Sequence, residues 1–170
     1  MIVKPLLTLI LCLFMNSSTV NLVSLRQQLD GAANDKALAE KFNAQFKNVS
    51  EKSLPILQGF KAISELLLCK HVFSPISKVS HFKKGKRMLE AAIAASPENP
   101  ELCFFRYTTQ SNVPGLLNYS SDLQADKRVL INALRNGSIK GDPDLFKRIK
   151  NYMLSSKYCT AQEITLLKSL

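Results

Sequence analysis

The chain has 170 residues, of which 46% are apolar, a size and composition that favour one ordered domain with a core over a disordered tail. Its net charge of +10 suits an acidic partner such as an anionic lipid, an acidic polysaccharide, an acidic protein or a nucleic acid. The 23 Lys and Arg residues are spread along the whole chain, whereas a nucleic-acid arm concentrates them, so nucleic acid is disfavoured. A solvated basic surface is the simplest explanation of the charge.

The first predicted element is a secretory leader over residues 1–20. A short positive start precedes an apolar run at residues 5–15, and small polar residues follow, an order typical of a signal peptide. The run is shorter than the roughly 20 residues that span a bilayer. Cleavage within residues 18–24 would export one helical domain, residues 21–170, to a bacterial periplasm or beyond, with no membrane span left. An uncleaved anchor is the alternative.

The remaining chain predicts helices and no strands, because apolar residues recur at helical spacing and no stretch alternates with a period of two. Gly31, Ser53, Ser120–Ser121 and Gly137 are the expected boundaries, and residues 160–163 match a capping box. Seven or eight helices are predicted, over residues 22–30, 35–48, 54–73, 77–96, 100–110, 121–135, 143–156 and 164–170. Short loops between them predict an all-α fold, an irregular superhelix of stacked helical hairpins.

Residues 88–106, MLEAAIAASPENPELCFFR, resemble the junction between two tetratricopeptide repeats. The matching positions are Ala91, Ala94, Ala95, Ser96, Pro97 and Asn99. The match covers one junction, without a second copy at a 34-residue offset and without the W-x₂-L-G-x₂-Y half. This resemblance implies a stack of helical hairpins whose concave face binds peptides or proteins. Residues 104–130 also resemble a segment of uncharacterised secreted bacterial helical proteins, which implies no activity.

One ion pair between helices is predicted from the helical wheel. Asp126 falls within the apolar face of its helix, and Arg106 lies at the edge of the apolar face of the preceding one. An unpaired buried carboxylate is unfavourable, and a guanidinium fits a carboxylate through two hydrogen bonds. We therefore expect Arg106 and Asp126 to pair, with Asn112 bonding backbone groups at the helix end. Tyr119 is expected to bury its ring and to bond through its hydroxyl.

The same corner also has a functional interpretation, as a groove that binds a sugar or a peptide. An Arg would take an anionic group, and aromatic rings would stack on the ligand. The residues that would line this groove are Arg106, Tyr107, Gln110, Asn112 and Tyr119. The sequence favours the structural clamp over this small-ligand or glycan site.

The sequence contains no HExxH, no GxSxG, no phosphate-binding loop and no dinucleotide fingerprint. Two acidic pairs beside prolines could be imagined as a general acid and base, but first-turn acids are ordinary partners of the helix dipole. These pairs are Glu98 with Glu101, and Asp142 with Asp144. We therefore expect no enzyme and no cofactor, with a degenerate hydrolase as the alternative.

Three cysteines follow the leader, at Cys69, Cys103 and Cys159, and they are too far apart in sequence to suggest a zinc site. At least two are expected to be buried free thiols. The run KKGKR at residues 83–87 is interpreted as mostly the solvated face of an amphipathic helix, with an anion site as the weaker alternative. Taken together, these features predict an exported interaction or scaffold module that binds a protein or an acidic envelope component.

Overall fold

The computed structural model describes residues 20–170, so the predicted leader lies outside the described residues except for its last position. The described chain is all-helical and has no strand, which confirms the predicted all-α fold with seven or eight helices. The elements are α1 (Leu22–Ala32), α2 (Lys36–Ala44), α3 (Pro55–His71), α4 (Pro75–Ala95), α5 (Pro100–Asn112), the 3₁₀ turn η1 (Gly115–Leu117), α6 (Leu123–Asn136), α7 (Pro143–Leu154) and α8 (Ala161–Ser169). Among these described helices, none has the length and apolar character needed to cross a membrane.

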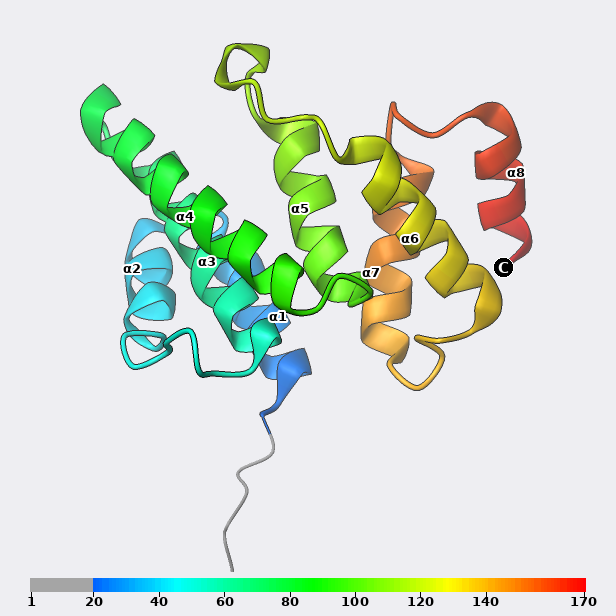
Figure 1. The fold of residues 1–170 in the computed structure, drawn as a ribbon, viewed down its shortest axis with the longest axis horizontal. Coiled ribbons are helices and arrows are strands. Elements are labelled where there is room, and N and C mark those ends of the chain that lie inside the picture. Colours follow the sequence, from blue (N-terminus) through cyan, green and yellow to red (C-terminus); the bar gives the residue numbers. More distant parts are fainter. Residues whose placement is uncertain (1–19) are drawn as a thin grey trace, which may run out of the picture.

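Helix α5 lies between two groups of helices (Figure 1). Helices α1 to α4 form one group, in which α3 and α4 make the longest hairpin, and α6 to α8 form the other. Helix α5 packs against α3 and α4 on one side and against α6 on the other. Helices adjacent in sequence pack against each other through most of the chain, as in a stack of hairpins.

Each group of helices has its own hydrophobic core, and α5 contributes to both. Leu102 and Phe105 belong to the first core, whereas Cys103 and Tyr107 belong to the second. The helical repeat of 3.6 residues places these two pairs on neighbouring faces of α5. The first core is rich in edge-to-face and stacked aromatic contacts among Phe42, Phe46, Phe60 and Phe105. Helix α5 is therefore the element that joins the two groups.

Several predicted helix boundaries are wrong by a few residues. Helix α1 continues past Gly31 to Ala32, and α2 ends at Ala44 rather than at residue 48. Ser53 does not cap α3, because Leu54 occupies the cap position and the Ser53 hydroxyl accepts from the backbone N–H of Ser50 instead. Local turns in the α2–α3 connection compete here with the capping geometry.

Helix α4 begins two residues earlier than predicted, at Pro75, because Ser74 caps it through its side chain. Asp122, rather than Ser120 or Ser121, precedes α6, and its carboxylate makes no capping bond. That carboxylate instead accepts hydrogen bonds from Ser121 and Gln110. The capping box at Thr160 is confirmed, with both of its hydrogen bonds present.

The run KKGKR is mostly solvated, as predicted, but its central glycine is not. Gly85 is buried against α3. A Cβ atom there would lie 2.7 Å from Leu66 Cγ and 2.9 Å from the carbonyl oxygen of Ala62. The glycine therefore permits α3 and α4 to approach closely, while Lys83, Lys84 and Arg87 are exposed as predicted.

Candidate functional site

The predicted ion pair between α5 and α6 is confirmed. Arg106 donates from Nε and Nη2 to the two carboxylate oxygens of Asp126, each at 2.8 Å. Its Nη1 donates to Oε2 of Glu90 on α4 at 2.7 Å. Asp126 is 1% exposed, so its charge is buried and depends on the guanidinium. Burial raises the pKa of Asp126, and the hydrogen bonds from Arg106 oppose that shift.

Tyr119 completes this first clamp. Its ring is buried and packs edge-to-face on Phe82, and its hydroxyl donates to Oε1 of Glu90 at 2.5 Å. Burial, followed by this hydrogen bond, raises the pKa of Tyr119 well above its ordinary range. The preceding Asn118 adopts a left-handed conformation with φ of 45°, which turns the chain from η1 toward Tyr119. The predicted burial and bonding of Tyr119 are thus confirmed.

The other residues of the predicted corner lie in different surroundings. Tyr107 is fully buried in the second core, its hydroxyl lies 2.7 Å from Ser156 Oγ, and burial raises its pKa to about 12. Gln110 is 2% exposed and donates to Asp122 at 3.3 Å. The side chain of Asn112 donates to the carbonyl of Thr108, as expected, and lies 2.8 Å from the Tyr152 hydroxyl. The polar groups of this corner are therefore largely bound to the protein itself, and only Asn112 is exposed.

A second clamp, centred on Arg26 of α1, was not anticipated from the sequence. Arg26 is 2% exposed and donates from Nε and Nη2 to both oxygens of Glu101 on α5, at 2.7 and 2.8 Å. Nη2 also lies 2.7 Å from Asp142 Oδ2, and Nη1 lies 3.0 Å from Asp142 Oδ1 and 3.1 Å from Asp144 Oδ2. One guanidinium thus joins α1, α5 and the start of α7.

Three of the four acids in the predicted pairs beside prolines belong to the Arg26 clamp. Glu101, Asp142 and Asp144 all bind Arg26, and Asp142 also caps α7 by accepting from the backbone N–H of Leu145. Burial raises the pKa of Glu101, partly opposed by Arg26. Burial also disfavours the Asp142 carboxylate, but the hydrogen bonds from Arg26 and from the Leu145 backbone, together with the charges of Arg26 and Arg148, outweigh burial and lower that pKa. These carboxylates are partners of a buried cation, whereas Glu98 is exposed and lies outside the cluster.

One signal for Arg26 was present in the sequence. Leu22, Leu25 and Leu29 follow helical spacing, and Arg26 falls within the same stripe. These leucines pack on the first core, so a charged residue among them needs a partner. Its partners lie 75 to 118 residues away and could not be assigned without the fold.

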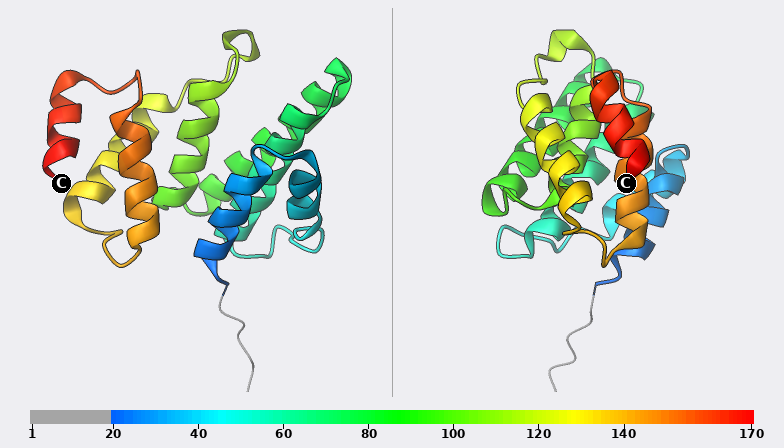
Figure 2. Two further views of the ribbon diagram at one scale, coloured as in Figure 1. Left: turned by 180° about the vertical axis from the view of Figure 1, so that it is seen from behind. Right: turned by 90° about the vertical axis from the view of Figure 1, so that its right-hand side faces the viewer.

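An open apolar groove of about 1200 Å³ lies between the two groups of helices. Helix α5 contributes one surface of the groove, α1, α3 and α4 contribute a second, and α7 contributes a third. Figure 2, seen from behind, shows α7 and the α1–α4 group on either side of α5. The apolar residues in the lining include Leu66, Leu67, Val79, Phe82, Phe104 and Val113. Among the residues of the predicted corner, Asn112 alone contributes to this groove.

Basic side chains flank the groove. Lys70 and Lys78 come from α3 and α4, and both are exposed. Arg148 on α7 binds Asp30 on α1 through two hydrogen bonds of 2.8 and 2.7 Å, and it also binds Asp144. The groove therefore combines an apolar surface with positive charge at its edge, and the Arg26 clamp joins the same helices α1, α5 and α7.

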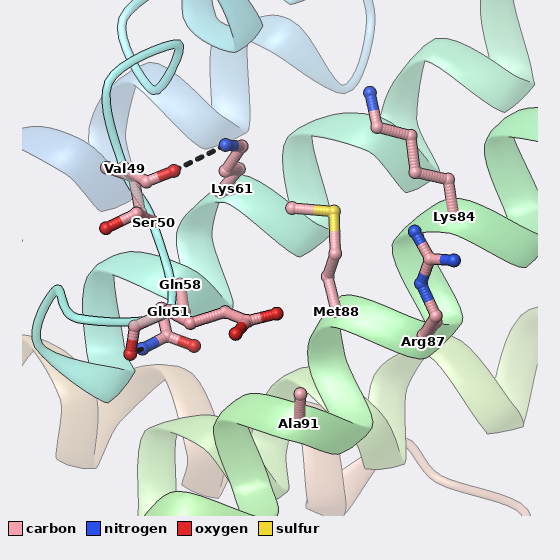
Figure 3. Close-up of a pocket in the computed structure, with 9 residues that line it drawn as sticks. All are labelled: Val49, Ser50, Glu51, Gln58, Lys61, Lys84, Arg87, Met88 and Ala91. Atoms are coloured by element: carbon pink, nitrogen blue, oxygen red, sulfur yellow. Dashed lines mark hydrogen bonds between the residues drawn. The ribbon is translucent and has the colours of Figure 1, made fainter.

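A smaller hollow of about 380 Å³ lies between α3, α4 and the α2–α3 connection (Figure 3). Lys84 and Arg87 project there from α4, while Lys61 donates to the carbonyl of Val49. Lys84 also binds the buried Glu65, whose pKa is lowered because Lys84, His81 and Asn43 together outweigh burial. Two of the side chains around this hollow join its walls, because Lys84 binds α3 and Lys61 binds the α2–α3 connection.

The three cysteines of the described chain are free. Cys103 is buried, and burial raises the pKa of its thiol to about 12, but Cys69 and Cys159 are only half-buried. The expectation of at least two buried thiols is therefore wrong, because Cys69 faces the groove. Within residues 20–170, no group of three or more His, Cys, Asp or Glu side chains is placed to hold a metal ion.

Comparisons with protein-family models, with curated proteins and with solved structures gave no match. The resemblance to tetratricopeptide repeats therefore stays a prediction, and the function is argued from the geometry of this chain alone.

Proposed function

We propose that this protein is an exported interaction module whose groove binds an amphipathic, acidic helical segment of a partner protein. The observation that carries the proposal is the apolar groove between α1, α3, α4, α5 and α7. Its volume of about 1200 Å³ exceeds the roughly 300–1000 Å³ of pockets that enclose small molecules. An open groove of this kind suits the apolar face of a helix, which is recognised through side chains one turn apart.

The charge of the groove edge favours an acidic partner. Nine of the 13 acidic residues form ion pairs between helices or helix caps, and the two arginine clamps alone hold six of them. All of these acids except Asp30 are buried or half-buried, so the outer surface is strongly basic. Lys70 and Lys78 would attract acidic side chains beside the apolar face of the bound helix.

A groove substitution tests this proposal in the purified protein. Thr108 lines the groove on α5, and its hydroxyl bonds only within its own helix, to the carbonyl of Phe105. Thr108→Arg places bulk and charge against the apolar surface. The probe is a fluorescent amphipathic peptide of about four helical turns, with Leu on one face and Glu on the other. We expect the variant to weaken its binding by tenfold or more, measured by fluorescence anisotropy.

Two controls make this experiment selective. Ala125→Arg on the exposed face of α6 adds the same charge away from the groove, and it should leave binding unchanged. A peptide with Lys in place of each Glu should bind more weakly than the acidic peptide. Two results would contradict the proposal. One is equal peptide binding by Thr108→Arg and Ala125→Arg, and the other is equal binding of the basic and the acidic peptide. Either result would show that the groove is not the binding site proposed.

Binding in the cell is tested by photo-crosslinking. A photoreactive residue at Asn151, on the α7 side of the groove, should crosslink to a partner, and Thr108→Arg should abolish the product. The same photoreactive residue at Ala125 should give no such product. A crosslink that survives Thr108→Arg would place the partner elsewhere on the surface.

A further inference from the structure

Two loops carry large apolar side chains that the fold leaves in solvent. Phe73 in the α3–α4 turn is 94% exposed, Ile76 in the adjoining first turn of α4 is 84% exposed, and Leu116 in η1 is 87% exposed. The α3–α4 turn and η1 project from the same end of the molecule in all three ribbon views (Figures 1 and 2). Isolated exposed apolar residues are ordinary, but three of the most exposed ones at one end form a distinct feature.

The chain around these tips carries no acidic residue. Between Glu65 and Glu90 lie six Lys or Arg residues and no Asp or Glu, and between Glu101 and Asp122 there is one Arg and again no acid. The six basic residues are Lys70, Lys78, Lys83, Lys84, Lys86 and Arg87. A partner surface of uniform negative charge would favour the absence of Asp and Glu around the tips, because it would repel them. A soluble protein partner would not favour this absence in particular.

The depth of the charges relative to the tips fits a lipid interface. Along α4, Lys78 lies about 3 Å and Lys83 about 10 Å from Ile76, at 1.5 Å per residue. Apolar side chains that insert 5–10 Å into the headgroup region would therefore place these lysines among the lipid phosphates. Lys70 and Lys78 are exposed and close in sequence to the tip, and Lys83 is a further exposed lysine along α4.

We propose that the α3–α4 turn and η1 form a docking surface for an anionic membrane, into which Phe73, Ile76 and Leu116 insert. Their insertion anchors the protein at the interface, and the lysines of α3 and α4 bind the phosphate groups. Docking brings the mouth of the groove close to the bilayer, because Leu117 of η1 lines the groove, as do Val113 and Val79 near the two tips. The docking surface shares Lys70 and Lys78 with the groove edge, but its apolar anchors Phe73, Ile76 and Leu116 are not groove residues.

Tryptophan fluorescence tests the inserted residues directly, because the chain contains no Trp. Phe73→Trp and Leu116→Trp each place one reporter at a tip, and Leu54→Trp is the matched control. Leu54 is 61% exposed but lies in the α2–α3 connection, at the opposite end of the molecule. With phosphatidylglycerol vesicles, the two tip reporters should shift to the blue and be quenched by brominated acyl chains, and the control should do neither.

Cosedimentation with the same vesicles tests the strength of docking in the full chain. The triple variant Phe73→Ser, Ile76→Ser and Leu116→Ser should lower binding by tenfold or more, and Leu54→Ser should leave it unchanged. The wild type and both variants keep the apolar run of residues 5–15, so any contribution of this run to vesicle binding is the same in every protein compared. Binding should fall with salt and with replacement of phosphatidylglycerol by phosphatidylcholine.

Three results would overturn the proposal. The first is a tip reporter that stays unshifted, or that shifts no more than the Leu54 reporter. The second is equal binding to neutral and anionic vesicles, which removes the role of the lysines. The third is a blue shift that depends on protein concentration without vesicles, which would assign the tips to a contact between two copies of the chain. Peptide binding by the groove is measured separately, so failure here leaves that proposal standing.

Discussion

The two arginine clamps have the same composition but join the chain over very different distances. Arg106 gathers Asp126, Glu90 and the more distant Asp122, and Arg26 gathers Glu101, Asp142 and Asp144. In each, three carboxylates surround one guanidinium. The Arg106 clamp joins helices that are close in sequence, whereas the Arg26 clamp joins α1 to α7 across more than 110 residues. The first holds a corner, and the second holds the two ends of the domain together.

Burial also differs between the two clamps. The side chain of Arg26 is 2% exposed, and that of Arg106 is 12% exposed. A carboxylate that loses its cation can recover hydration only where water reaches it, so the cost of breaking a clamp rises with burial. Of the two arginines, Arg26 is therefore the one on which the fold depends more.

The largest effect is expected from Arg26→Ala. It leaves Glu101 buried without a cation and removes the link between α1 and α7. We expect a loss of about 3–5 kcal/mol in the free energy of unfolding, measured with urea. Arg135→Ala is the matched control, because Arg135 is exposed on α6 and should change stability by less than about 0.5 kcal/mol. A loss below about 1 kcal/mol for Arg26→Ala would mean that the helices open and hydrate the acids.

The next effect concerns the corner clamp, through a double-mutant cycle on Arg106→Ala and Asp126→Ala. We expect Arg106→Ala to cost about 3 kcal/mol and Asp126→Ala about 2 kcal/mol, since Arg106 keeps Glu90 in the second variant. The coupling energy should be about 1–3 kcal/mol in urea unfolding. Additive losses without coupling would show that the 2.8 Å hydrogen bonds contribute little beyond packing.

The sequence predicts one clamp and misses the other for a physical reason. A helical wheel shows that Arg106 and Asp126 face inward, and a short connection makes their helices neighbours, so the pair follows from local pattern. The wheel also places Arg26 among leucines, but nothing local brings α7 beside α1. The groove is likewise a product of the whole arrangement, because its surfaces come from five helices. The helices themselves were predictable, since their caps, prolines and periodicity are local signals.

A third charged group extends the comparison, because it carries the opposite charge to the two clamp arginines. Glu65 is a buried acid among basic partners, and its pKa is lowered below its ordinary value of 4.5. Its ionised form therefore contributes stability that is fully present above pH 4.5 and is lost as the pH falls through the lower, folded-state pKa. We expect Glu65→Gln to cost about 1–2 kcal/mol at pH 6, because Lys84 and His81 remain partly hydrated.

The measurement is the unfolding free energy of both proteins from pH 6 to pH 3. The gap between wild type and Glu65→Gln should stay constant down to about pH 4.5 and then narrow, because protonated Glu65 resembles Gln. A gap that keeps its size at pH 3 would show that the carboxylate contributes through shape and packing, and not through its charge.

The smallest effect is expected at the exposed link between the same two helices that Arg26 joins. Asp30 and Arg148 pair at 2.7 and 2.8 Å, but their side chains are 58% and 25% exposed. A double-mutant cycle to Ala should give a coupling of about 0.5–1 kcal/mol at low salt. At 1 M NaCl the screening length is about 3 Å, so this coupling should vanish while the effect of Arg26→Ala changes little. Asp144 connects this exposed link to the Arg26 clamp, because it binds both Arg26 and Arg148. A coupling that persists at 1 M NaCl would mean that this shared carboxylate makes the buried clamp and the exposed link one network.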